Sequence, residues 1–97
     1  MSVTVRIPTI LRTYTNGAAE VLVDPAASDS GATLAGVLAA LEASAPGIGA
    51  RVHDDDGRLR RFVNVYVNDD DVRFADGLET ATPDGCHVSV IPAVAGG

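Results

Sequence analysis

One segment of this 97-residue chain has the spacing of an amphipathic helix, and runs typical of strands stand on both sides of it. Its apolar residues fall at positions i, i+3, i+4 and i+7: Leu34, Val37, Leu38 and Leu41. We predict a helix that begins after Thr33 as its N-cap and stops before Pro46-Gly47. A single helix of this kind must bury its apolar stripe against a sheet, which points to an α+β domain.

The strand patterns before the helix predict an antiparallel pair. Residues 3–7 alternate apolar and polar side chains, and a second run at residues 20–23 follows the turn signal Asn16-Gly17. The wide spacing between the two runs predicts a longer connection than a tight hairpin.

The strand patterns after the helix are stronger. Residues 62–67 alternate three valines with Phe62, Asn64 and Tyr66, so the valine face is expected to cover the helix. Residues 72–74 are predicted as a short edge strand. A turn at Pro83-Asp84-Gly85 then leads into a last strand at residues 87–91, whose Val88 and Val90 are expected to face inward.

The predicted order is therefore β-β-α-β-β-β, a mixed sheet of four to five strands with one main helix on one face. The right-handed crossover rule allows the last strand to lie parallel beside the first. The outer face of such a sheet would carry a set of side chains that we take as a candidate docking face: Arg6, Phe62, Tyr66, His87 and Ile91. Aromatic side chains on an uncovered sheet face indicate a binding surface.

Charge excludes one class of function. All seven basic residues are arginine, against thirteen acidic residues, and the net charge of −6 argues against nucleic-acid binding. The acidic runs at residues 54–56 and 69–71 are expected to be solvated loops that steer the domain towards a basic partner surface. No apolar run approaches membrane-spanning length and no signal-peptide pattern opens the chain, so we expect a cytoplasmic protein without a membrane partner.

Cysteine and histidine give no sign of a metal or catalytic site. Cys86 is the single cysteine, so it cannot form an internal disulfide, and we expect a structural role for it. His53 and His87 are not spaced as a metal pair, and the chain has no glycine-rich phosphate loop. We therefore expect no bound metal and no bound cofactor.

The end of the chain is the candidate functional group. We divide the chain into a domain at residues 1–91 and a flexible tail at 92–97 that ends in Gly96-Gly97. Without Cβ atoms, these glycines can pass through a narrow channel in a partner, as could the adjoining Val94 and Ala95 in an extended tail of at most about 20 Å. The Gly97 carboxylate is then the group on which a partner would act.

With this tail, the chain resembles the ubiquitin-like (β-grasp) sulfur carriers of the MoaD/ThiS family, and within it the CysO type. The resemblance spans essentially the whole chain and rests on four segments, residues 7–12, 61–68, 71–74 and 91–97. It implies that an E1-like enzyme of the MoeB/ThiF type uses ATP to adenylate Gly97, after which sulfur displaces AMP to leave a thiocarboxylate. Such a carrier is a cosubstrate and not an enzyme.

The resemblance also implies partners. A CysO-type carrier delivers sulfur to a pyridoxal-phosphate cysteine synthase, and a zinc metalloprotease of the JAMM type then releases cysteine. Another sulfur-transfer enzyme, such as a thiosugar synthase, is a further possible acceptor. ATP, pyridoxal phosphate and zinc would all belong to these partners.

Three alternatives stay open. The small subunit of molybdopterin synthase has the same fold and activation chemistry. A ubiquitin-like protein modifier would pass Gly97 to a lysine of a target, although the absence of lysine here excludes chains of this protein on itself. A non-covalent β-grasp binding module would leave the tail idle.

Overall fold

A computed structural model describes residues 2–25 and 32–92 of the chain. Five strands form one sheet: β1 (Val3–Arg6), β2 (Glu20–Val23), β3 (Val63–Val67), β4 (Asp70–Asp71) and β5 (His87–Pro92). The α-helices are α1 (Leu34–Ser44) and α2 (Gly49–Val52). Short 3₁₀ helices are η1 (Thr9–Thr15), η3 (Val72–Phe74) and η4 (Gly77–Glu79).

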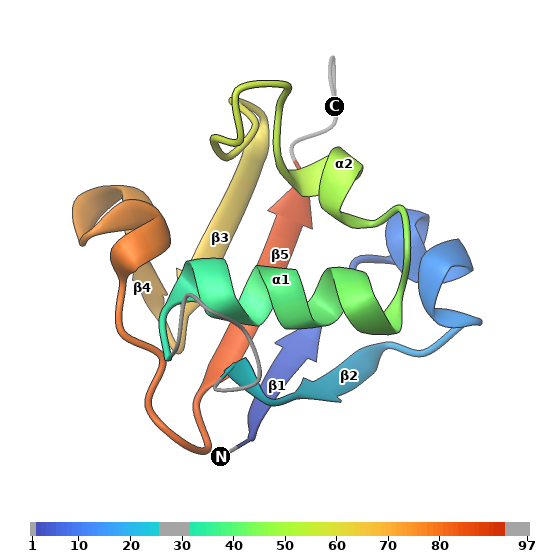
Figure 1. Ribbon diagram of the computed structural model, residues 1–97, viewed down its shortest axis with the longest axis horizontal. Coiled ribbons are helices and arrows are strands. Elements are labelled where there is room, and N and C mark those ends of the chain that lie inside the picture. The colour runs from blue at the N-terminus through green and yellow to red at the C-terminus, as the bar shows by residue number, and fades with distance from the viewer. Residues whose placement is uncertain (1, 26–31, 93–97) are drawn as a thin grey trace.

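The sheet is mixed, and β5 lies at its centre. The strand order is β2-β1-β5-β3-β4, with β1 and β5 parallel and every other pair antiparallel. Helix α1 crosses one face of the sheet (Figure 1). The predicted β-grasp architecture, with the last strand parallel to the first, is confirmed.

Helix α1 begins and ends as the sequence predicts. The Thr33 side chain accepts a hydrogen bond from the Gly36 amide at 3.3 Å, which satisfies one of the free donors of the first turn. Beyond the last turn, the two carboxylate oxygens of Glu42 accept from the amides of Gly47 at 2.7 Å and Gly49 at 2.9 Å. These bonds fix the bend that leads from α1 into α2.

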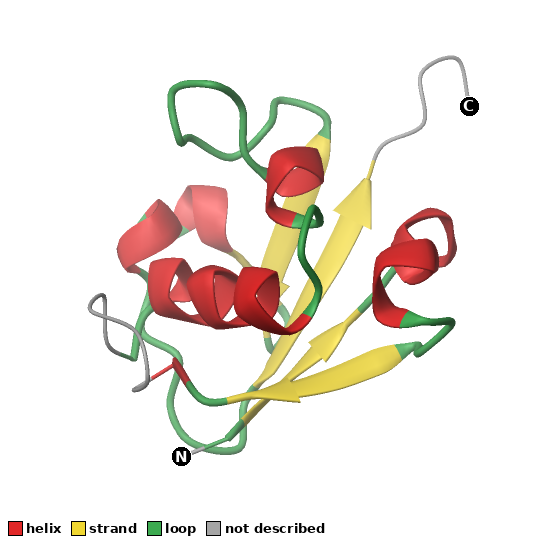
Figure 2. Cartoon of the chain, turned by 45° about the vertical axis from the view of Figure 1, so that its right-hand side comes forward, coloured by secondary structure: helices red, strands yellow, loops and turns green. Residues whose placement is uncertain are grey.

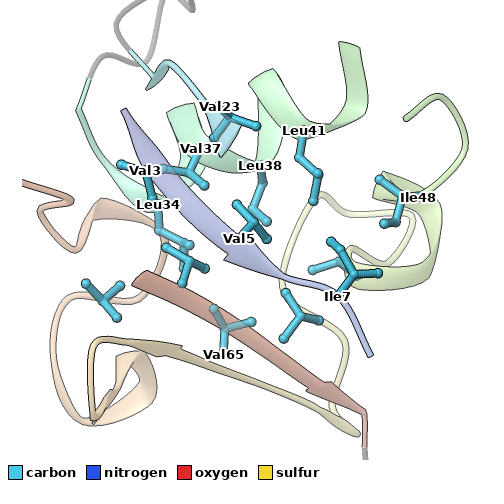
Figure 3. Packing of buried hydrophobic residues seen from close by; sticks show 14 of the residues in the cluster. Val3, Val5, Ile7, Val23, Leu34, Val37, Leu38, Leu41, Ile48 and Val65 are labelled. Carbon is cyan, nitrogen blue, oxygen red and sulfur yellow. The ribbon is translucent and has the colours of Figure 1, made fainter. Parts of the chain in front are cut away.

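The core lies between α1 and the valine-rich face of the sheet. Val63, Val65 and Val67 of β3 are buried, as are Val88 and Val90 of β5, which confirms the predicted inward face. Figure 3 shows Leu34, Val37, Leu38 and Leu41 of α1 among the buried side chains of β1 and β3. Ile48, in the bend before α2, extends the same cluster.

The fourth strand was predicted in the wrong place. Residues 72–74 form the 3₁₀ turn η3, and the edge strand is instead the two-residue β4, which pairs with Tyr66 and Val67. The Asp71 side chain caps this turn by accepting from the Arg73 amide at 2.9 Å, and Val72 is buried. A capped turn that buries its apolar residue replaces the extended edge.

Smaller differences concern element ends. Phe62 precedes β3, in a turn closed by the Val63 amide donating to the Arg60 carbonyl at 3.0 Å. The wide connection between β1 and β2 is the helix η1, and α2 was not predicted. Asn16 and Gly17 do form a turn, both with positive φ, at the end of η1.

Candidate functional site

The tail leaves from the middle of the sheet. Pro92, the last residue described, still pairs with Val63, so β5 includes the first residue of the predicted tail. Val94, Ala95, Gly96 and Gly97 lie outside the described residues. In Figure 1 the arrow of β5 points to the end of the molecule where α2 and the loop before β3 are found.

The outer face of the sheet carries the polar set that the alternation predicts. Arg6 of β1 stands beside Ser89 of β5, which stands beside Tyr66 of β3. Arg6 also faces Glu20 of β2, with the guanidinium Nε 3.5 Å from a carboxylate oxygen. This row crosses four strands, and the helices α1 and α2 lie on the other side of the sheet (Figure 2).

The predicted docking residues lie at three distances from the tail. Ile91, which is 50% exposed, and Phe62, which is 64% exposed, lie next to the root of the tail. Tyr66 is half-buried and Arg6 exposed, one row further in. His87 is exposed at the other end of β5, about 13 Å from Ile91 at the usual rise per residue of a strand.

Three shallow hollows border Ile91 or Phe62. Ile91 borders two of them, of about 230 Å³ beside Arg6 and Pro8 and about 260 Å³ beside Tyr66 and Asn68. The third, of about 350 Å³, lies between Phe62 and Pro92 and is also lined by Arg60 and Arg61. Ile91 and Phe62 are therefore apolar edges of concave surface, a form that suits contact with a partner.

Arg73 fixes the segment that carries Phe62. Its Nη2 donates to the carbonyls of Arg61 and Val63, each at 2.8 Å, and Nη1 donates to Asn64 Oδ1 at 2.7 Å. A further contact reaches the Arg60 carbonyl at 3.1 Å. Sequence reasoning missed this role, because the bonded residues are 9 to 13 positions away and no local pattern links them.

Cys86 and His53 occupy different environments. Cys86 is buried, and desolvation raises the pKa of its thiol, which disfavours the nucleophilic thiolate. His53 is half-buried with Nδ1 3.3 Å from the Gly49 carbonyl. Within residues 2–25 and 32–92, no group of three or more His, Cys, Asp or Glu side chains is arranged to hold a metal.

A further hollow lies away from the predicted docking face. It has a volume of about 500 Å³ between α1, α2 and the loop after α2, with Leu38, Ala39, Ala50 and Leu78 in its mostly apolar lining. Its lining also includes Glu42, His53, Asp54, Asp55 and Arg60, but the described His, Cys, Asp and Glu side chains form no group that could hold a metal. The predicted docking residues Ile91 and Phe62 border the smaller hollows instead.

Comparison with known proteins assigns the chain to a family. The ThiS family model matches residues 5–97. The chain belongs to the ThiS family. No helix in the described part of the chain is long and apolar enough to cross a membrane.

The ThiS-family relatives are carriers and small modifiers. The sulfur carrier protein CysO of Mycobacterium tuberculosis is 54% identical over 99 residues, covering 100% of both chains. A chain in the crystal structure of the Amycolatopsis orientalis BexX/CysO complex superposes with a TM-score of 0.86 at 47% identity, covering 98% of this chain and 99% of that one. The structure of SAMP1 from Haloferax volcanii superposes with a TM-score of 0.80 at 31% identity, with 100% of each chain covered. The resemblance to CysO-type sulfur carriers is thus confirmed over the full chain.

Proposed function

We propose that this ThiS-family chain is a sulfur carrier whose Gly97 carboxylate is adenylated by an E1-like enzyme of the MoeB/ThiF type and then converted to a thiocarboxylate. The observation that carries the proposal is the position of β5. This central strand is paired on both sides and ends at Pro92, so residues 93–97 follow directly from a fixed point of the sheet. Full-length similarity to a sulfur carrier supports Gly97 as the reacting terminus.

The chemistry requires two substitutions. A carboxylate oxygen of Gly97 attacks the α-phosphorus of ATP, and pyrophosphate leaves. Sulfide then attacks the carbonyl carbon of the acyl-adenylate, a C–S bond forms, and AMP leaves with the oxygen that linked it. No oxidant or reductant is needed when sulfide is the donor.

The chain contributes reach and anchoring to these steps. Five residues follow Pro92, an extended length of at most about 18 Å, which suits a channel that excludes the domain itself. Because Cys86 is buried, it does not compete as an internal sulfur nucleophile. Catalytic groups, ATP and any pyridoxal phosphate or zinc belong to partner enzymes.

Docking is proposed for the outer sheet face. Phe62 and Ile91 are the apolar contacts nearest the tail, while Arg6, Tyr66 and His87 supply polar contacts further along the same face. An apolar patch next to the end of the chain lets one surface bind while Gly97 reaches the reacting centre. Proximity of this kind is a large part of catalysis on a tethered group.

The sulfur acceptor is proposed to be a cysteine synthase, with a JAMM-type metalloprotease releasing the product. The A. orientalis BexX/CysO complex favours a second possibility, in which the same thiocarboxylate serves another sulfur-transfer enzyme such as a thiosugar synthase. A role as the small subunit of molybdopterin synthase or as a protein modifier would use the same activation step. The name of SAMP1, small archaeal modifier protein 1, favours the modifier among these alternatives.

The deciding experiment is intact-mass analysis after incubation with the organism's E1-like enzyme, ATP and sulfide. A carrier gains one sulfur in place of one oxygen, located at Gly97 by fragmentation. The variant that lacks Gly96 and Gly97 should stay folded and gain nothing, and Gly97→Ala should slow adenylation because its methyl group must enter the channel. Unchanged mass with an active enzyme would contradict the carrier function.

A separate measurement distinguishes the modifier. A modifier yields higher-mass conjugates in cells, joined through Gly97 to lysines of other proteins, and a dedicated carrier yields none. Detection of such conjugates under sulfur-replete growth would favour a role as a protein modifier.

A further inference from the structure

All seven arginines lie around the end of the sheet at which β5 finishes. Arg6 ends β1, which runs parallel to β5, and three further arginines precede β3, whose first residue pairs with Pro92. Helix α2 and the loop before β3 lie at this end in Figure 1. We call this set the arginine rim: Arg6, Arg12, Arg51, Arg58, Arg60, Arg61 and Arg73.

Most of the arginine rim is fixed in position by neutral acceptors. Arg12 Nε donates to the Ile7 carbonyl at 3.1 Å, Arg51 Nε to the Tyr14 hydroxyl at 2.8 Å and Arg60 Nε to the Ala50 carbonyl at 3.0 Å. Arg73 binds three carbonyls and an amide oxygen, as described above. A carbonyl holds a guanidinium in place without cancelling its charge.

Carboxylates do little to neutralise the rim. In the described part of the chain, one arginine, Arg6, has a carboxylate within 4.0 Å. The exposed side chains of Arg58 and Arg61 make no hydrogen bond or ion pair within residues 2–25 and 32–92. This is unexpected in a chain with thirteen acidic residues.

Charge is in fact separated along the molecule. The end with the arginine rim holds seven arginines and five carboxylates, namely Glu20, Glu42, Asp54, Asp55 and Asp56. The rest of the described molecule holds seven carboxylates and no arginine: Asp24, Asp69, Asp70, Asp71, Asp76, Glu79 and Asp84. The net charge of −6 thus conceals a positive end that coincides with the root of the tail.

We propose that the arginine rim docks on an acidic protein surface around the entrance of a partner's tail-binding channel. The proposal rests on the carrier function, since it names the kind of partner surface that accepts the tail. Net charge alone favours a basic partner, whereas the distribution of charge favours an acidic one at this end. Fixed arginines lose little side-chain entropy on binding, which makes them suited to an interface.

Charge separation also orients the encounter. An acidic entrance attracts the rim and repels the opposite, acidic part of the domain, so that the tail arrives first. Complementary charges of this kind raise the association rate, and added salt weakens them because the Debye length is about 10 Å at 0.1 M.

The test compares two variants with the same net charge. Arg61→Gln removes one charge from the rim, and Ala81→Glu adds one negative charge at an exposed site beyond the rim, so each carries one more negative charge than the original chain. Pyrophosphate release by the E1-like enzyme should show KM raised about threefold by Arg61→Gln at low salt, more by Arg58→Gln with Arg61→Gln, and little by Ala81→Glu. The difference should disappear near 0.5 M salt. Equal effects of Arg61→Gln and Ala81→Glu would overturn the proposal.

A second test needs no enzyme and so separates this proposal from the carrier function. In NMR titrations of the full chain at low salt, poly-glutamate should shift the amides of residues 58–61, and poly-lysine should shift those of residues 69–71 and 84. If ATP shifts residues 58–61 at lower concentration than poly-glutamate, the rim is a nucleotide site and the proposal fails. If the enzyme leaves the original chain unmodified, the carrier function fails, and this titration still decides whether the rim prefers an acidic polypeptide.

Discussion

The two faces of the sheet are made by the same strands and have opposite properties. Towards α1, the side chains of β1, β3 and β5 are aliphatic and buried, with Val88 of β5 fully enclosed. On the other face the neighbouring positions are Arg6, Ser89 and Tyr66, open to a partner. Because successive residues point to opposite faces, one strand can specify the fold with one half of its residues and present a surface with the other.

The difference between the two faces is tested most directly by placing the same negative charge on each face. Val88→Asp puts an unpaired carboxylate into the core and should reduce the free energy of unfolding by more than about 4 kcal/mol, enough to unfold a domain of ordinary stability. Ser89→Asp, one residue along β5, faces Arg6 and should change it by less than about 1 kcal/mol. Urea denaturation followed by circular dichroism measures both. Similar losses in the two variants would contradict the division of faces.

Positions on the outer face should also differ in how much they contribute to binding. Ile91→Asp places a charge in an exposed apolar contact beside the tail and should weaken binding to the E1-like enzyme about tenfold, while stability changes by less than about 1 kcal/mol. Leu22→Asp is the matched control, because Leu22 is also exposed on the outer face, at 69%, but lies on the edge strand β2. Calorimetric titration measures both affinities. An equal loss in the two variants would remove Ile91 from the docking face.

Alternation explains why so much of the fold follows from the sequence. The inward valines, the helix with its Thr33 cap and the parallel placement of β5 each depend on local periodicity or on a general rule of chain handedness. The outer-face residues Arg6, Tyr66, His87 and Ile91 follow from the same period of two. Phe62 was assigned to a strand that in fact begins one residue later.

What could not be predicted depends on contacts between distant segments. An Asp-Asp pair has low strand propensity, so β4 exists because the Asn68 turn, with φ of 55°, brings it against β3. Helix α2 has only four residues and starts at glycine, and Glu42 of α1 holds it in place. The arginine rim could not be predicted for the same reason, because its arginines are spread from position 6 to position 73 and lie near one another only in the folded chain.

A substitution at Arg73 tests whether the segment that carries Phe62 needs this side chain to hold its shape. Arg73→Gln removes a guanidinium that joins η3 to the segment before β3, and we expect a loss of about 1 to 2 kcal/mol in the free energy of unfolding. Arg58→Gln is the matched control, because the Arg58 side chain is exposed with no bonded partner in the described residues, and it should change stability by less than about 0.5 kcal/mol. Chemical denaturation gives both values, and amide shifts in the Arg73 variant should concentrate at residues 60–64. A neutral result for Arg73→Gln would show that the docking segment holds its shape without this clamp.

The smallest expected change in stability concerns Cys86, which is buried. Burial raises the pKa of its thiol in the folded state, so the folded chain keeps its proton at a pH where the unfolded chain has begun to lose it. The unfolded state then binds fewer protons, and stability should fall as pH rises above the ordinary thiol pKa of about 8.5. The slope cannot exceed about 1.4 kcal/mol per pH unit for one group. Denaturation at pH 7 and pH 9.5 should show a smaller fall in Cys86→Ala than in the original chain, although that variant is less stable throughout because of the space it leaves. An identical pH dependence in the two proteins would show that the thiol is in contact with water and is not buried.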